Sequence, residues 1–176
     1  MGGTMKNRII VTIGWISVIL PQITVIQSII NDQEAYNHCL TDNNAFIAII
    51  WPIAQGKETA IKKILNRYGK ILYHKPFYFD KLSAYKILHY AHQHIPNGQP
   101  HCGSLKEHVK WYFPKGTYKN QASIYLLWFE RSSDAISCKR TIRMLFPQLQ
   151  YRSIHINDYH AETIQLAKFF FMAHDS

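Results

Sequence analysis

The sequence lacks the short motifs that mark several large enzyme classes. Gly98 and Gly103 are not followed by the Lys-Ser/Thr pair of a P-loop, and there is no G-x-S-x-G nucleophile elbow and no paired-carboxylate motif. The chain also contains no long run of Lys or Arg, no internal repeat and no low-complexity tract. These absences exclude a P-loop phosphate site, an α/β-hydrolase elbow and a basic nucleic-acid tail as explanations of its function.

Cysteine is also scarce, with Cys39, Cys102 and Cys138 far apart and no C-x-x-C pair. An odd number of separated cysteines argues against a disulfide framework, so we expect reduced thiols and a cytoplasmic location. The histidines and the cysteine between positions 89 and 102 follow no established zinc spacing. We therefore predict no metal site on the chain itself.

The residues that are abundant suit one packed domain. Of 176 residues, 47% are hydrophobic and 14% aromatic, a composition typical of a globular core. The formal net charge is +9. Such a surplus favours an anionic partner, which includes a nucleotide or other phosphorylated anion, nucleic acid and anionic lipid, although a merely solubilising surface produces the same value.

An uncharged segment, Ile9–Asn31, follows Lys6 and Arg8 near the N-terminus. Its length and basic flank are typical of a membrane anchor or signal, its polar residues suit a packed hydrophobic helix, and a mis-assigned translation start is a third reading. We predict residues 1–31 as this hydrophobic segment, with membrane anchoring through residues 9–30 as one alternative. Residues 32–44 are predicted as a polar linker, and residues 45–172 as the domain.

The domain alternates between strand and helix patterns in the order β-α-β-αα-β-α-β-α. This order predicts a mixed α/β (α+β) fold with a ferredoxin-like split βαβ antiparallel sheet and helices on one face, preceded by the N-terminal hydrophobic helix. The predicted strands are Ala45–Trp51, Lys70–Phe79, Ala122–Phe129 and Gln148–Ile154. The predicted helices are Lys57–Tyr68, Asp80–Ala91, Ser104–Phe113, Asp134–Phe146 and Asp158–Phe171.

One histidine stands out, in the segment Arg152-Ser-Ile-His-Ile-Asn-Asp158. His155 is expected between the last strand and the last helix, where the N–H groups of the helix N-terminus favour negative charge. Neutral imidazole can attack phosphorus there, and nearby cations can stabilise the transferred charge. A hydrogen-bonded structural histidine is the competing interpretation.

Several segments, in the same order along the chain, resemble nucleoside diphosphate kinases. Phe46–Pro52 is similar to that family's first strand, and Ser153-Ile-His-Ile-Asn-Asp158 is similar to its active-site Ile-His-Gly-Ser-Asp. Further similarity covers Ile61–Gly69, Leu126–Arg131 and Ala161–Phe171, so the resemblance spans about Ala45 to Phe171. It implies a nucleotide-binding phosphotransferase that uses ATP and Mg²⁺.

The resemblance also implies roles for individual residues. His155 would be the histidine that becomes phosphorylated, and Lys139 or Arg140 would fall near that family's phosphate-binding Arg. Arg152, which replaces an Asn of the family three positions before the histidine, is the third candidate phosphate-binding cation. The residues expected to cap the last helix or support the histidine are Asn157, Asp158 and Glu162.

A second hypothesis is a non-catalytic basic ferredoxin-like module that binds nucleic acid or a protein partner. Trp51 stands where the resembled family has a phosphate-contacting lysine, Ile156 and Asn157 replace Gly-Ser, and Phe146–Gln150 is shorter than that family's nucleotide-binding loop. In this alternative His155 only joins the last strand to the last helix. The sequence leaves homo-oligomer formation open under both hypotheses.

Overall fold

The computed structural model of the chain describes residues 30–92, 104–113 and 120–172. The predicted N-terminal hydrophobic segment lies outside these residues, apart from its last two positions. Within the described ranges, no helix combines the length and the apolar character that a membrane crossing requires.

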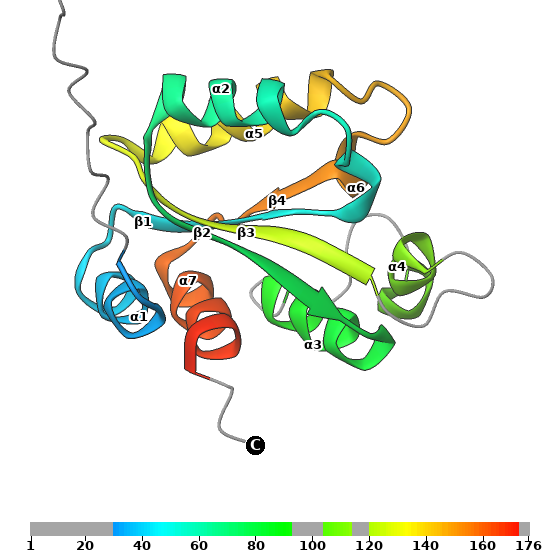
Figure 1. Cartoon of the computed structure of the whole chain (residues 1–176), viewed down its shortest axis with the longest axis horizontal. Helices are drawn as coiled ribbons and strands as arrows, with labels where there is room; N and C mark the ends of the chain where they lie inside the picture. The colour runs from blue at the N-terminus through cyan, green and yellow to red at the C-terminus, as the bar shows by residue number, and fades with distance from the viewer. Residues whose placement is uncertain (1–29, 93–103, 114–119, 173–176) are drawn as a thin grey trace, which may run out of the picture.

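An antiparallel sheet of four strands forms the centre of the domain, in the order β2-β3-β1-β4 (Figure 1). β1 lies inside the sheet, and all of its side chains are buried. The predicted mixed α/β domain and its antiparallel sheet are therefore confirmed. The strands are β1 (Ala45–Ile50), β2 (Lys70–Phe79), β3 (Asn120–Trp128) and β4 (Ile154–Ile156).

Helices cover both faces of the sheet, so the predicted placement of all helices on one face is wrong (Figure 1). The continuous apolar sequence of β1 is the reason, because successive side chains of a strand point to opposite faces and each apolar face needs cover. On one side lie α2 (Glu58–Tyr68) and α5 (Ser132–Met144), and on the other α1 (Asp32–Thr41), α3 (Lys81–His92), α4 (Leu105–Tyr112) and α7 (His160–Ala167).

The predicted polar linker over residues 32–44 is largely the helix α1. A capping box begins it: the backbone N–H of Glu34 donates to Asn31 Oδ1 and the backbone N–H of Asn31 donates to Glu34 Oε2, both at 2.9 Å. Ala35 and Cys39, four residues apart, are buried against the sheet. Two small apolar residues are a weak signal in a polar segment, which is why a linker was predicted.

Asp32 connects α1 to the edge strand β2. Its carboxylate accepts hydrogen bonds from the Tyr73 hydroxyl at 2.5 Å and from the Lys75 ammonium at 2.6 Å. Burial, together with the neighbouring Asp32, raises the pKa of Tyr73 to about 12. Lys75 also donates to the carbonyl of Phe170, so the N-terminal and C-terminal helical segments meet at this strand.

The last strand differs from the predicted Gln148–Ile154. Residues Gln150–Ser153 form a short helix, α6, and only Ile154–Ile156 pair with β1. Backbone N–H groups just before β4 pair with nearby carbonyls and not with β1. Leu149 N–H donates to Phe146 C=O at 2.9 Å, and Arg152 N–H donates to Leu149 C=O at 2.8 Å. The last helix is also shorter than predicted: α7 spans His160–Ala167, and a π-helical turn, Lys168–Met172, follows it.

Gly69 allows α2 to end tightly against the sheet. A Cβ atom built at this position would lie 2.6 Å from Trp128 O and 2.7 Å from the Phe129 ring. Gly69→Ala is therefore expected to lower the free energy of unfolding by about 2 kcal/mol through overpacking. Gly56→Ala is the control, because Gly56 has φ of 86° and open space around it, so backbone strain alone costs about 1 kcal/mol there. Equal urea midpoints for the two variants would contradict the close approach at Gly69.

Candidate functional site

His155 is the central residue of β4, not a residue that follows the strand. It pairs with Ile49 of β1, and directly opposed residues of an antiparallel pair share a face of the sheet. Ile49 belongs to the core on the side of α7, whereas Ile154 and Ile156 belong to the core under α2 and α5. The imidazole therefore points to the α7 side, and its side chain is 16% exposed.

Glu162, in the first turn of α7, is the hydrogen-bond partner of the histidine. Its Oε1 lies 2.5 Å from His155 Nε2, and the residue is only 2% exposed. An ionised carboxylate only accepts hydrogen bonds, so with ionised Glu162 this contact corresponds to the tautomer that carries its proton on Nε2. In the neutral ring the lone pair then resides on Nδ1, the nitrogen that could act as a nucleophile.

The second carboxylate oxygen of Glu162 extends the site to α5, in the other helical layer. Glu162 Oε2 accepts from the backbone N–H of Asp158 at 3.2 Å. The Asp158 side chain in turn forms an ion pair with Lys139, with 2.6 Å between Oδ1 and Nζ. Lys139 is buried, at 7% exposure, although it carries a charge. A chain of contacts thus connects the histidine to a buried cation around the edge strand β4.

The Lys139–Asp158 ion pair has one buried and one exposed partner, since 9% of the Lys139 side chain is exposed but 52% of the Asp158 side chain is. Asp158→Ala leaves a buried ammonium without its counter-charge, so we expect it to lower the free energy of unfolding by about 2 kcal/mol. Lys139→Met leaves a carboxylate that water can solvate, and its expected effect is within about 1 kcal/mol. Chemical denaturation of both variants checks this order, which the reverse ranking would contradict.

Asn157 holds β4 and α7 against β1. Its Oδ1 accepts from Ile47 N–H at 2.6 Å, and its Nδ2 donates to Thr163 Oγ1 at 2.6 Å. The Thr163 hydroxyl in turn donates a hydrogen bond to the Ala45 carbonyl at 3.2 Å. The predicted helix-cap role of Asn157 and Asp158 is wrong, because the N-cap residue of α7 is Tyr159, whose side chain makes no capping hydrogen bond. Asn157 Nδ2 also donates to the Tyr159 carbonyl at 3.2 Å. No pattern in the sequence indicates Thr163, because its role depends on a contact across the fold.

The three predicted phosphate-binding cations do not converge. Lys139 is held by Asp158, whereas Arg140, next to it on α5, is exposed and takes no part in the contacts that join His155 to Lys139. Arg152 lies on α6 with its guanidinium carbon 3.8 Å from the centre of the Trp111 ring, a cation–π contact with α4. Trp111 therefore connects α4 to α6.

Trp51 occupies the core at the end of β1. It is 1% exposed, and its ring stacks on Tyr112 of α4 with 4.2 Å between centroids. Where the resemblance would have a lysine against phosphate, this chain has an aromatic pair that fixes α4 to the sheet.

Neither a protein metal centre nor a cysteine nucleophile is formed by the residues that the structure describes. No group of three or more His, Cys, Asp or Glu side chains that could hold a metal ion occurs among them. Burial raises the pKa of both Cys39 and Cys138 to about 12, so these two thiols stay protonated and unreactive at neutral pH. Cys102 lies outside the described residues.

Comparison of the chain with protein-family models, with curated proteins and with solved structures finds no match.

Proposed function

We propose that this domain is a nucleotide-binding phosphotransferase-like protein, a divergent relative of the nucleoside diphosphate kinases with a ferredoxin-like sheet, in which His155 accepts a phosphoryl group. The observation that carries the proposal is the contact between His155 Nε2 and the buried carboxylate of Glu162. Support for the fold comes from the strand order β2-β3-β1-β4 and from α2 and α5 packing on the same face, as a split βαβ pair requires.

The proposed chemistry is an in-line displacement at phosphorus. The lone pair on His155 Nδ1 attacks the γ-phosphorus of ATP, an N–P bond forms, the bond to the bridging oxygen breaks, and its electron pair leaves with ADP. Glu162 keeps the proton on Nε2 and stabilises the positive charge that the ring gains during attack. The phosphoryl group then passes to an acceptor nucleotide or another phosphorylated anion.

Cations that belong to the site would stabilise the transferring charge. The ammonium of Lys139 has donors beyond the one that it gives to Asp158, and Arg152 could turn from the Trp111 ring toward a bound phosphate. Arg140 is the candidate for an outer contact with the nucleotide, because it is exposed beside Lys139. Mg²⁺ would enter with ATP, held by the donor's phosphates. Use of ATP fits a cytoplasmic domain, whether or not residues 9–30 attach it to a membrane.

Labelling of the full chain tests this proposal. The protein is incubated with γ-labelled ATP and Mg²⁺, and the bound label is exposed to acid and to base. Phosphohistidine loses its phosphoryl group in acid and keeps it in base, so acid-labile and base-stable label is the expected result. No covalent label, or label that survives acid, would contradict the proposal.

Glu162 is a positioning residue in this proposal. Two replacements of it separate its effect on the orientation of the His155 ring from its effect on the folding of the protein. Glu162→Leu is expected to slow labelling about 100-fold, because nothing then fixes the proton on Nε2. Glu162→Gln retains an oxygen that can accept from Nε2–H, so its rate should stay within about 10-fold of the wild type. The measurement is the initial labelling rate of each variant, with circular dichroism to establish that both are folded. Equal rates for the two variants would mean that the carboxylate does not orient the ring.

The alternative function, a non-catalytic basic module for nucleic acid or a protein partner, has specific support of its own. Trp51 replaces a phosphate-binding lysine with a core residue, and Lys139 and Arg152 are already engaged by Asp158 and Trp111. A salt-dependent mobility shift with RNA or DNA, in a protein that acquires no label, would favour this alternative.

A further inference from the structure

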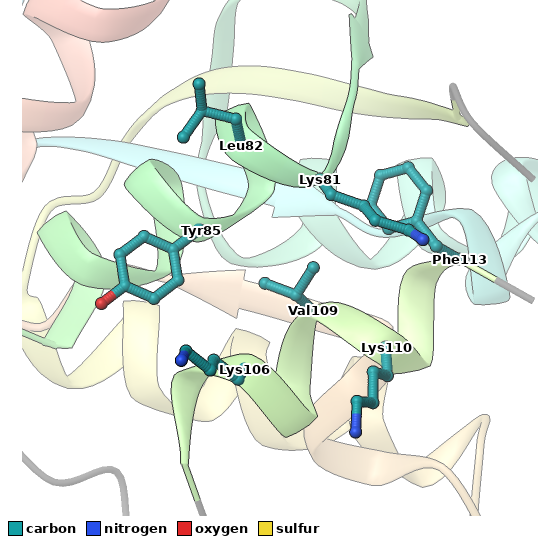
Figure 2. A pocket seen from close by; sticks show the side chains of 7 residues that line it. All are labelled: Lys81, Leu82, Tyr85, Lys106, Val109, Lys110 and Phe113. Carbon is teal, nitrogen blue, oxygen red and sulfur yellow. The ribbon is translucent and has the colours of Figure 1, made fainter.

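A groove separates α3 from α4, on the outside of the helical pair that connects β2 to β3. It encloses about 400 Å³, and Figure 2 shows the side chains that line it. Its apolar lining comes from Leu82 and Tyr85 of α3, Val109 of α4 and Phe113 just after α4. Leu82 is 63% exposed and Tyr85 is 40% exposed. Two large exposed side chains of this kind beside a hollow are typical of a surface that a ligand covers.

Three lysines share this groove with the apolar side chains: Lys81 of α3, and Lys106 and Lys110 of α4. Among the described residues that line it, none is acidic. In Figure 2 the two lysines of α4 lie along one side of the hollow, with Lys81 near Phe113. A positive border around an apolar floor is complementary to a molecule that has an apolar body and a negative head.

The groove is independent of the His155 site. Lys106, Val109 and Lys110 recur at helical spacing and face α3, whereas Trp111 lies about 200° around the helix from Val109 and receives Arg152. α4 therefore presents one side to the candidate active site and another to the groove. A ligand in the groove and a nucleotide at His155 would not share lining residues.

We propose that this groove binds a soluble small-molecule amphiphile with an anionic head, of which a medium-chain carboxylate is the simplest example. The hydrocarbon body lies against Leu82, Tyr85 and Val109, and the carboxylate pairs with Lys106 and Lys110. The volume suits such a molecule, since small-molecule sites enclose roughly 300–1,000 Å³. A helical peptide would need apolar anchors over two or more turns of its own length, which is more than this hollow offers.

Calorimetric titration of the full chain with decanoate, below the concentration at which it forms micelles, tests the proposal. Decanoate is expected to bind at least about 10-fold more tightly than decyltrimethylammonium, which has the same tail and the opposite charge. Affinity should rise by up to about fourfold for each methylene from octanoate to decanoate, as expected for buried hydrocarbon. Equal affinity for the anion and the cation, or no dependence on chain length, would overturn the proposal.

Charge-reversal variants test where on the protein the ligand binds. The double variant Lys106→Glu/Lys110→Glu is expected to weaken decanoate binding at least about 10-fold. The matched control is Lys62→Glu/Lys63→Glu on α2, which makes the same change of charge at two exposed lysines outside the groove and should leave the affinity unchanged. Equal losses in both double variants would overturn the proposal, because they would reflect net charge alone.

Two competition results would also overturn it. If ATP displaced decanoate, the groove would be part of a nucleotide site. If anionic vesicles bound through the same lysines while decanoate did not bind, the occupant would be a membrane surface and not a soluble amphiphile.

Discussion

His155→Ala is expected to remove all of the acid-labile label that the wild-type protein acquires from γ-labelled ATP. The side chain that carries the nucleophilic nitrogen is absent in this variant, and a buried carboxylate alone cannot form a phosphoramidate. The measurement is label retained on the protein after treatment with base and after treatment with acid. Loss of the label should be complete, because no other described residue is placed against Glu162 Oε1.

The control for this variant is His160→Gln. His160 is also in the first turn of α7, but its Nε2 lies 2.9 Å from the carbonyl of Cys39, in a contact with α1. Label is expected to persist in His160→Gln, since this histidine belongs to the packing of α7 and not to the phosphoryl path. Label that survives in His155→Ala, or that disappears equally in His160→Gln, would show that His155 is not the acceptor.

Asn157→Ala is expected to lower the free energy of unfolding by about 3–5 kcal/mol, the largest loss of stability that we predict for a single side chain. Asn157 is 1% exposed, and its removal leaves Ile47 N–H and Thr163 Oγ1 without their 2.6 Å contacts. A buried polar group left without a partner costs about 1–3 kcal/mol, and the cavity of the lost amide adds to it.

Urea denaturation measures this loss, with Asn66→Ala as the matched control. Asn66 is exposed on α2, so the same substitution there should change stability by less than about 0.5 kcal/mol. Thr163→Val should fall between the two, because it removes the bond to Asn157 and the 3.2 Å bond to the Ala45 carbonyl but retains the volume of the side chain. A loss below about 1 kcal/mol for Asn157→Ala would show that β4 and α7 are held by other contacts.

Strong local patterns made much of the fold predictable. The apolar run of β1 and the helical spacing of Ile61, Leu65 and their neighbours in α2 matched the observed elements. Asp80 was expected to begin a helix, and its carboxylate does accept from Ser83 N–H at 2.7 Å at the start of α3. These features depend on residues close together in the sequence, which is why sequence alone could supply them.

Features that depend on distant contacts were not predictable. α1 depends on two small buried residues. The length of β4 depends on which residues meet β1, and only Ile154–Ile156 do so. In the candidate site, Lys139, Arg140 and Glu162 were named from the resemblance, and Arg152 was named as a cation close to His155 in the sequence. Arg152 instead packs on Trp111, a contact between α6 and α4 that no local pattern indicates.

The position of the phosphoryl group on the ring shows whether His155 acts as a nucleophile that Glu162 orients. The wild-type protein is labelled, digested in base, and the two phosphohistidine isomers are separated by chromatography and compared with standards. Because Glu162 holds Nε2, we expect phosphohistidine substituted on Nδ1, recovered from the peptide that contains His155. Phosphohistidine substituted on Nε2, a label on another residue, or no phosphohistidine at all would contradict it.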